Sequence, residues 1–544
     1  MHYSKIAQAL QEISIASRSC KADLAAALLS EITPDSENLC PAVRLLLGEL
    51  WPPWEVREMG IGPEAVMTAL AEVSDQDVHS LRESLHEVGQ VAEAALGQKG
   101  QHPLFHEPLE VRSVYERLAR ISEMSGKESE QRKNALLRGL FLEATPLEGK
   151  FIARTALRNM QAGFGHKTMI AAISSALHCD REKIERAYGL VPDLGKIAVM
   201  AQGGKLEDVT LQAKTPIRFM LFRQSDPVVP GCFLPRYPGL RVQVHKLKKD
   251  VLIFTGQLRD ITASLGGISR LLEGIRSDFV IDSLLMGFHD GAGKGKEICS
   301  QADMLRYINR RHLSRKSGIR PFLLAYDLIA LQGESICSMP YQDRRKRLLS
   351  ILGEPQALPF LGISPAGEHF LTDLSEVADL LTNATGARAL MERDLTAPYL
   401  PGKIAESDFI TRAGHKLAAM IVQFSWGRDR NAMVSGRMVA GKYMVALRQE
   451  GELVPVGWVS RGLTEDDRSR VSHALTTLIA GESEGKGGSQ VSVPATVLLN
   501  LKISGAHKRA GRYVIDRPVI ESFKLGASPG DADEMNRLEK ISRR

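Results

Sequence analysis

Cysteine is scarce in this chain and never occurs in closely spaced pairs. The 544 residues include six cysteines, and no two of them form a Cys-x-x-Cys motif. Structural zinc sites usually draw on such motifs, and disulfide-stapled secreted proteins need a denser cysteine framework. The cysteine content therefore argues against structural zinc and disulfides and predicts a reducing, intracellular compartment, which we take to be the cytoplasm.

Long apolar runs and a strong charge of either sign are missing as well. No stretch approaches the ~20 consecutive apolar residues that a membrane-spanning helix needs, so we expect no membrane partner. The start, MHYSKIAQALQEI, has the spacing of an amphipathic helix and not of a signal peptide. The formal net charge of +6 permits nucleic-acid binding without requiring it.

The spacing of apolar residues divides the chain into three regions, as its length leads us to expect. Residues 1–212 have apolar residues every three or four positions, which predicts an all-α domain. Residues 213–407 mix helical and alternating patterns, which predicts an α/β domain. Residues 408–544 are dominated by alternating patterns and favour a small β-barrel of the OB type. The strands expected across the last two regions include Leu240–Val244, Val251–Thr255, Phe279–Ile281, Phe322–Tyr326, Ala418–Phe424, Tyr443–Arg448, Leu453–Val459 and Val491–Ile503.

The run CFLPRYPGLRVQVHK, at residues 232–246, carries the most specific signal. It resembles the nucleotide-binding loop of ATP-dependent DNA ligases of the archaeal type, which reads Lys-Tyr-Asp-Gly-x-Arg followed by Val-Gln-x-His-Lys. The tyrosine, glycine, arginine and most of the second phrase are present. Arg236 stands in the place of the lysine, and Pro238 in the place of the aspartate.

The helical region resembles the DNA-binding domain of the same family. The matching phrases include Ser17-Arg18 and Asn159-Met160-Gln161-Ala162-Gly163-Phe164-Gly165 with Thr168. The resemblance implies that Arg18, Gly163, Gly165 and Thr168 contact duplex or nicked DNA. Glycine lets the backbone approach closely, and a helix N-terminus favours anions, so the physics supports this role. A plain helix–helix turn is the alternative.

Taken along the whole chain, the resemblance implies a multidomain protein of DNA replication, repair or recombination. Its parts would be a helical DNA-binding domain at 1–212, an ATP-grasp-like nucleotidyltransferase domain at 213–407 and an OB-fold domain at 408–544. ATP and Mg²⁺ are implied as cofactors by the resemblance alone. A sliding clamp or another repair protein is a possible partner.

The residue at position 236 decides the expected chemistry. In the family a lysine amine attacks the α-phosphate of ATP, which requires a nitrogen with a free lone pair. The guanidinium of Arg236 stays protonated, so it can bind a phosphate but cannot form the covalent adenylate. Leu284 and Arg388 stand where the family has carboxylates and cannot coordinate Mg²⁺. We therefore expect self-adenylation to be impaired or lost.

Some features of the nucleotide pocket survive. Arg241 matches the arginine of the loop and is expected to meet a ribose or a phosphate. Tyr326 takes the place of the aromatic residue that stacks on adenine, although packing of a strand residue in the core is an equal alternative. Lys403 lies in a loop, Pro398–Lys403, that the family shares. For the basic run Arg344–Arg347, a solvated helix face and phosphate contact are equal alternatives.

Three functions remain open at this point. The first is a DNA-binding member of the ligase family that does not adenylate itself. The second is an active ATP-dependent ligase that seals nicks with displaced catalytic residues. The third is a non-enzymatic scaffold for repair partners, which would lack DNA affinity even at low ionic strength.

Overall fold

The structure is a computed structural model, and it describes residues 1–17, 19–33, 35–99, 107–126, 128–212, 214–289, 297–309, 318–358, 360–384, 386–412, 415–427, 433–434, 437–477, 490–503, 505–509, 511–516 and 518–542. The chain forms two compact units. The first unit comprises Met1–Arg223, Pro230–Phe370 and Glu392–Phe409, and the second comprises Gln224–Val229, Leu371–Met391 and Ile410–Arg544. The two boundaries predicted between three domains, at 212 and 407, stay a prediction.

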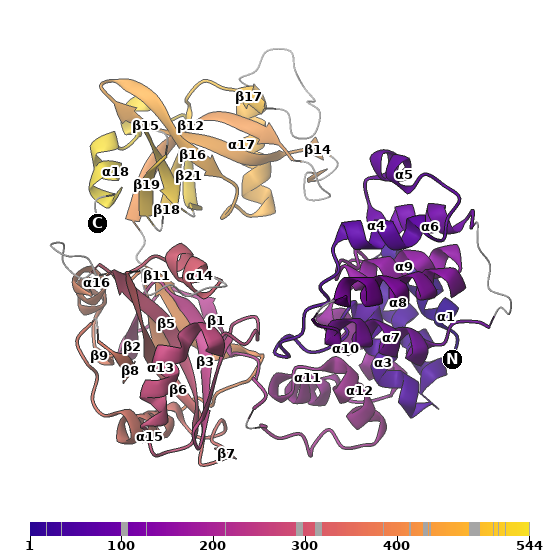
Figure 1. Cartoon of the computed structure of the whole chain (residues 1–544). Coiled ribbons are helices and arrows are strands. Elements are labelled where there is room, and N and C mark those ends of the chain that lie inside the picture. The colour runs from indigo at the N-terminus through magenta and orange to yellow at the C-terminus, as the bar shows by residue number, and fades with distance from the viewer. Residues whose placement is uncertain are drawn as a thin grey trace. The chain divides into compact units, whose positions relative to one another are not determined.

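The N-terminal part of the first unit is all-helical, as predicted (Figure 1). Many of its helices begin at residues that cap the free backbone N–H groups. Thr145 and Glu148 form a capping box at α9, and the Asp193 side chain accepts from the Lys196 N–H at α12. The helices are α1 (Tyr3–Ile15), α2 (Cys20–Ile32), α3 (Ser36–Leu47), α4 (Pro63–Ala71), α5 (Val78–Leu85), α6 (Val88–Leu96), α7 (Val111–Glu123), α8 (Ser129–Glu143), α9 (Pro146–Ala156), α10 (His166–Ala176), α11 (Arg181–Leu190) and α12 (Leu194–Gln202).

The second part of the first unit is built on a mixed sheet with the strand order β4-β3-β5-β6-β7, and β8 pairs with β6. Its central strands β3, β5 and β6 are buried over nearly their whole lengths, which fits the apolar runs of β5 and β6. Helix α15 packs on β6, and α13 packs on β4. The elements are β3 (Leu240–Leu247), β4 (Asp250–Thr255), η1 (Thr262–Leu265), α13 (Gly266–Glu273), β5 (Phe279–His289), α14 (Gln301–Ile308), β6 (Ile319–Leu331), β7 (Glu334–Ser335), α15 (Tyr341–Leu352) and β8 (Gly362–Pro365).

A five-stranded sheet has the strand order β1-β11-β10-β2-β9. Strand β2 ends at Arg236, and β10 ends at Arg393. The elements of this part are β1 (Leu221–Gln224), β2 (Gly231–Arg236), β9 (His369–Leu371), α16 (Leu374–Asn383), β10 (Ala389–Arg393) and β11 (Ile404–Arg412).

The second unit is mostly a sheet in the order β16-β15-β12-β18-β21, with β17 paired to β12. The turn between β15 and β16 has positive φ at both Glu450 and Gly451, as a two-residue hairpin turn requires. The expected strand Val491–Ile503 is instead two strands. The elements are β12 (His415–Trp426), β13 (Met433–Val434), β14 (Arg437–Met438), β15 (Ala440–Gln449), β16 (Glu452–Val459), α17 (Glu465–Thr477), β17 (Gln490–Ser492), β18 (Val497–Ile503), β19 (Gly505–Arg509), β20 (Arg512–Asp516), β21 (Val519–Leu525), η4 (Pro529–Asp531) and α18 (Met535–Ser542).

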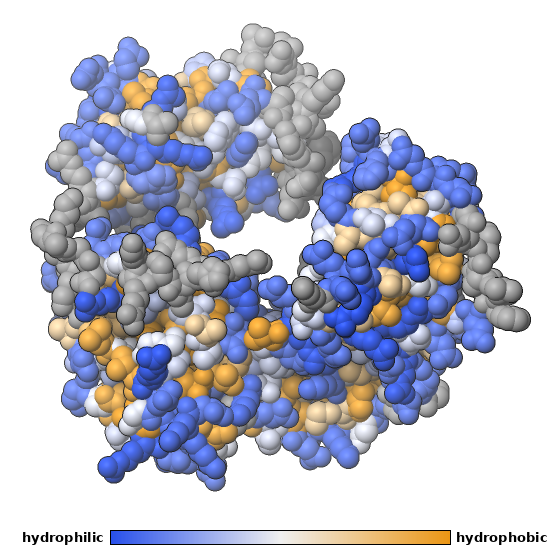
Figure 2. Space-filling model, viewed as in Figure 1, coloured by the Kyte–Doolittle hydropathy of each residue, from blue (hydrophilic) through white to orange (hydrophobic). Residues whose placement is uncertain are grey.

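The surface of the molecule is mixed in character. On the face shown in Figure 2, hydrophilic side chains predominate over the helical region and apolar ones gather in small groups. None of the described helices combines the length and the hydropathy that crossing a bilayer requires. The described cysteines are all free thiols.

Candidate functional site

A hollow of about 560 Å³ opens beside the start of α10. Three of the four expected DNA-contact residues line it, namely Gly163, Gly165 and Thr168. The fourth, Arg18, lies outside the described residues. The structure adds four residues that the sequence did not single out, and all of them carry a cation or an imidazole: Lys21, His166, Lys167 and Arg218.

Gly163 and Gly165 shape the backbone around the hollow. Gly163 has φ +57°, a left-handed conformation in which a side chain is strained. Gly165 precedes the first residue of α10, and no side chain caps this end of the helix. The Lys21 ammonium donates to the Ala162 carbonyl at 2.7 Å. Because an uncapped helix start carries partial positive charge, the hollow combines backbone N–H donors with fixed cations.

His166 and Arg218 are held on one aromatic ring. The imidazole of His166 stacks on Tyr188 with ring centroids 5.7 Å apart, and its Nε2 lies 2.8 Å from a Glu49 carboxylate oxygen. The Arg218 guanidinium lies over the same ring at 4.9 Å and donates to the Tyr188 hydroxyl at 3.0 Å. Tyr188 thus fixes two side chains of the hollow from α11.

The expected nucleotide pocket lies where β2, β3, β5, β6 and β10 supply side chains. A bulge in the pairing of β5 with β6 sets Asp282 opposite Asp327 and Ser283 opposite Ala325, so Tyr326 is the additional residue. Tyr326 is buried, its hydroxyl donates to the Pro235 carbonyl at 2.9 Å, and burial raises its pKa. A stacking role for Tyr326 toward adenine remains a prediction.

Arg241 is already engaged by side chains of the protein. Its Nε and Nη2 donate to the two carboxylate oxygens of Asp282 at 3.0 and 2.5 Å, and its Nη1 donates to the Met220 carbonyl at 2.7 Å. The Tyr399 hydroxyl donates to the same carboxylate at 3.0 Å. Phe219 lies against the guanidinium, 4.6 Å from its central carbon. The charge of Arg241 is therefore balanced from within.

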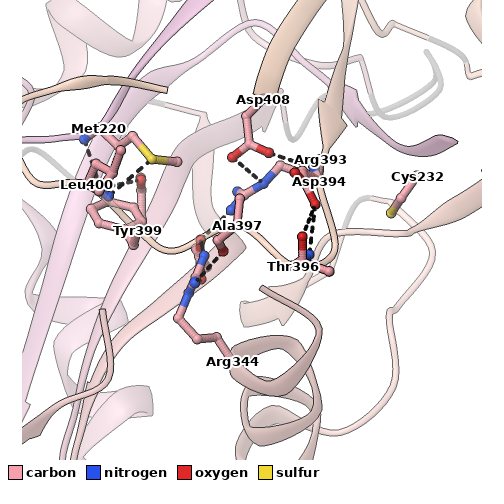
Figure 3. A network of polar contacts seen from close by, with 12 residues as sticks. Met220, Cys232, Arg344, Arg393, Asp394, Thr396, Ala397, Tyr399, Leu400 and Asp408 are labelled. Carbon is pink, nitrogen blue, oxygen red and sulfur yellow. Dashed lines mark hydrogen bonds and ion pairs between the residues drawn. The ribbon is translucent and has the colours of Figure 1, made fainter. Parts of the chain in front are cut away.

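A second buried ion cluster surrounds Arg393, at the end of β10 (Figure 3). Its guanidinium contacts Asp327 at 2.6 Å and Asp408 at 3.2 Å, and Arg344 binds both oxygens of Asp327 at 2.9 Å. All four side chains are at most 1% exposed. The ring of Tyr341 lies 4.0 Å from the centre of the Arg393 guanidinium. Two guanidinium and two carboxyl groups thus neutralise one another in the core.

The pKa values of the two carboxyl groups of this cluster are shifted in opposite directions. Burial acts to raise the pKa of Asp327, but Arg393 and Arg344 outweigh it, so the pKa is lowered. For Asp408 burial prevails over the attraction of Arg393, and the pKa is raised. Asp408 also accepts a hydrogen bond from the Asp394 N–H at 2.7 Å (Figure 3).

The solvated-face interpretation of the basic run Arg344–Arg347 is wrong for its first half. Arg344 is fully buried and Arg345 is 5% exposed, whereas Lys346 and Arg347 are exposed. The misreading arose because a helix face of adjacent arginines usually points to water. Arg344 is buried against Asp327, which is 17 residues away in the sequence, so no local pattern indicates this ion pair.

Lys403 contributes its backbone to the described contacts. Its N–H donates to the Leu400 carbonyl at 3.2 Å, and its own carbonyl accepts from the Leu221 N–H at 2.8 Å. Arg236, at the end of β2, acts electrostatically on Tyr326 and lowers the pKa of that hydroxyl against the larger effect of burial. The structure thus brings Arg236 and Tyr326 together, with Arg241 and Asp282 on the neighbouring strands β3 and β5.

The residues present do not fit magnesium and ATP as an adenylating site would hold them. Leu284 is buried and apolar, and the Asp282 carboxylate is engaged by Arg241 and Tyr399. Among the residues that the structure describes, no three His, Cys, Asp or Glu side chains come together as a metal-binding group. A transferring phosphate would lack the counter-charge that bound magnesium supplies.

Comparison with known proteins places the chain. Residues 2–174 match the family model described as "DNA ligase N terminus", and residues 233–407 match "ATP dependent DNA ligase domain". Together the two matches cover more than half of the sequence. The chain belongs to the ATP-dependent DNA ligase family.

Archaeal relatives match this ligase-family chain over almost its whole length. The DNA ligase of Thermococcus fumicolans is 26% identical, and the match covers 99% of this chain and 98% of the relative. The DNA ligase of Archaeoglobus fulgidus is 28% identical, covering 95% and 94%. Among solved structures, the ligase domain of M. tuberculosis LigD is 18% identical with a TM-score of 0.30, covering 58% of this chain and 97% of that domain. The family assignment rests on the sequence matches.

Proposed function

We propose that this member of the ligase family binds duplex or nicked DNA and does not form a covalent adenylate. The supporting observation is that the chain has a basic hollow at α10 and a pocket whose arginines already form ion pairs with aspartates of the protein. The hollow at α10 has cations and backbone donors that suit phosphate oxygens. In the pocket, Arg236 replaces the nucleophile, and Arg393 is enclosed by Asp327 and Asp408.

The second unit is proposed to be an OB-fold that adds to the DNA-binding surface. Its sheet order β16-β15-β12-β18-β21, with α17 between β16 and β18, supports a five-stranded barrel of that type. A hydrogen bond from the Ile520 N–H to the Arg461 carbonyl joins the chain after β16 to β21, as closure of a barrel would.

DNA binding is tested by titrating a fluorescent nicked duplex with the whole chain over a range of salt concentrations. The proposal expects affinity that falls steeply with salt, and Lys167→Gln is expected to reduce the slope of log K against log salt by about 0.9, the share of one phosphate contact. Lys346→Gln is the matched control, because Lys346 is also exposed but lies on α15. No binding at low salt would favour the scaffold function instead.

Adenylation is tested separately with labelled ATP and Mg²⁺, beside sealing of a pre-adenylated nick. We expect no labelled protein, because arginine cannot supply the attacking lone pair. A labelled band that disappears when one lysine is changed would establish the second function, an active ligase with a displaced nucleophile.

A further inference from the structure

The segment Ile217–Met220 touches both the DNA hollow and the former nucleotide pocket. Its Arg218 lines the hollow and contacts Tyr188 on α11. Its other three residues are buried, and Ile217 and Met220 belong to a small core with β5 and β6 residues such as Val280 and Ile329. One short segment therefore reaches two sites that lie far apart in the sequence.

The pocket side holds this segment through a set of buried hydrogen bonds. The Ile217 N–H donates to the Gln243 side-chain oxygen at 3.0 Å, and the Gln243 amide donates back to the Ile217 carbonyl. At the other end of the segment, the Met220 carbonyl accepts from Arg241 at 2.7 Å, and the Met220 N–H donates to the Tyr399 hydroxyl at 3.2 Å. The backbone polar groups of Ile217 and Met220 are thus fixed by side chains of the pocket.

The same side chains are locked to one another. Tyr399 accepts from Met220 and donates to Asp282, and Asp282 binds Arg241 through both oxygens. A buried tyrosine that uses its hydroxyl both as donor and as acceptor has little freedom to turn. The position of Arg218 therefore depends on Tyr399, Asp282 and Arg241.

The helical side of the segment is equally specific. The Arg218 N–H donates to the Gly189 carbonyl at 2.8 Å, and the Arg218 carbonyl accepts from the Gly402 N–H at 3.0 Å. The Arg218 guanidinium has five N–H donors, of which Tyr188 receives one, and the side chain lines the hollow, so donors remain for a ligand there. An arginine held at both its backbone and its ring contact is pre-organised for a phosphate.

We propose that Arg218 is a DNA-backbone contact supplied from outside the helical region and positioned by Arg241, Asp282 and Tyr399. This inference rests on the proposed DNA-binding function. In this inference the pocket side chains hold the segment Ile217–Met220 in place, and Arg218 of that segment binds a DNA phosphate. Arg218 touches the DNA, and Tyr399 is a positioning residue that acts through it.

The test compares four variants of the whole chain on the same nicked duplex. Arg218→Gln is expected to weaken binding by about tenfold and to lower the salt slope by about 0.9. Tyr399→Phe removes the hydroxyl that holds Met220 and is expected to weaken binding by about threefold with a partial loss of slope. Tyr341→Phe is the matched control, because Tyr341 is also a buried tyrosine but its hydroxyl has no hydrogen-bond partner among the described residues.

The double variant Arg218→Gln/Tyr399→Phe separates positioning from a merely structural role. If Tyr399 acts through Arg218, the double variant binds no more weakly than Arg218→Gln alone. Additive losses, or wild-type affinity and slope in Arg218→Gln, would overturn the inference. Loss of binding in Lys167→Gln with no change in Arg218→Gln would leave the proposed function standing and this inference refuted. Absence of DNA binding by the unaltered chain would refute the proposed function itself.

Discussion

Arg241 and Asp282 form a two-point ion pair between neighbouring strands, with N···O distances of 3.0 and 2.5 Å. The Asp282 side chain is 4% exposed, so neither partner is well solvated if the other is removed. The resemblance to the family implies that Arg241 meets a ribose or a phosphate, and in this structure Arg241 is paired with Asp282. The ion pair is therefore expected to contribute to the stability of the fold whether or not a ligand is bound.

Asp282→Asn is expected to lower the free energy of unfolding by about 2–3 kcal/mol, because it leaves the Arg241 guanidinium, which is only 22% exposed, without its counter-charge. Urea titration followed by circular dichroism measures this loss. Asp226→Asn is the control, since Asp226 is 85% exposed in its pair with Lys502 and should change stability by less than about 1 kcal/mol. Equal losses in the two variants would contradict the structural role of Asp282.

Asp408 should make the free energy of unfolding depend on pH. Its raised pKa means that the folded chain binds a proton there more tightly than the unfolded chain does, so ionised Asp408 opposes folding. This penalty is complete above the raised pKa and fades as the pH falls through it toward the ordinary value of 3.8. We therefore expect the stability of the wild type relative to Asp408→Asn to rise as the pH falls.

Asp226 provides a control of opposite sign for the same measurement. Its hydrogen bond with Lys502 lowers its pKa, so its contribution to stability is present above the ordinary value of 3.8 and is lost as the pH falls below it. The stability of the wild type relative to Asp226→Asn should therefore decrease on acidification. Parallel trends for the two variants in denaturant titrations would show that Asp408 is not held ionised against burial.

Restoring the lysine alone should not restore adenylation. Arg236→Lys regains an amine, but Leu284 and Arg388 still lack carboxylates, and Arg393 still pairs with Asp327 and Asp408. Because the parts of such a site act together, we expect no labelled protein with ATP and Mg²⁺. A covalent AMP adduct on this variant would show that position 236 is the single defect.

Alanine variants of the two glycines of the hollow should distinguish an effect on stability from an effect on DNA binding. Gly163→Ala places a side chain at φ +57° and is expected to cost about 1 kcal/mol of stability. A Cβ at Gly165 meets nothing within 4 Å, so Gly165→Ala should leave the melting temperature unchanged. It would nevertheless weaken DNA binding, because the methyl group obstructs close approach of a phosphate to the start of α10. Wild-type affinity for Gly165→Ala would exclude a backbone contact there.

The sequence predicted the helical region, the strands β3 to β6 and the glycine turn, because these rest on local periodicity and on residues with special backbone freedom. It failed for Arg344, whose burial depends on Asp327 in a strand that precedes it. It also passed over Arg218, since nothing in the phrase Pro216–Leu221 indicates that one of its side chains meets α11. Pairings between distant segments are the part of a fold that local patterns do not encode.

The two backbone hydrogen bonds of Arg218 have a mechanical consequence. One leads to the end of α11 at Gly189, and the other leads to Gly402 in the loop before β11. A Cβ at Gly189 would lie 2.3 Å from the Pro401 carbonyl oxygen, so the fit tolerates no methyl group. Because these bonds tie helical and β-sheet residues of the first unit together, we expect both parts of that unit to unfold together, as one calorimetric peak.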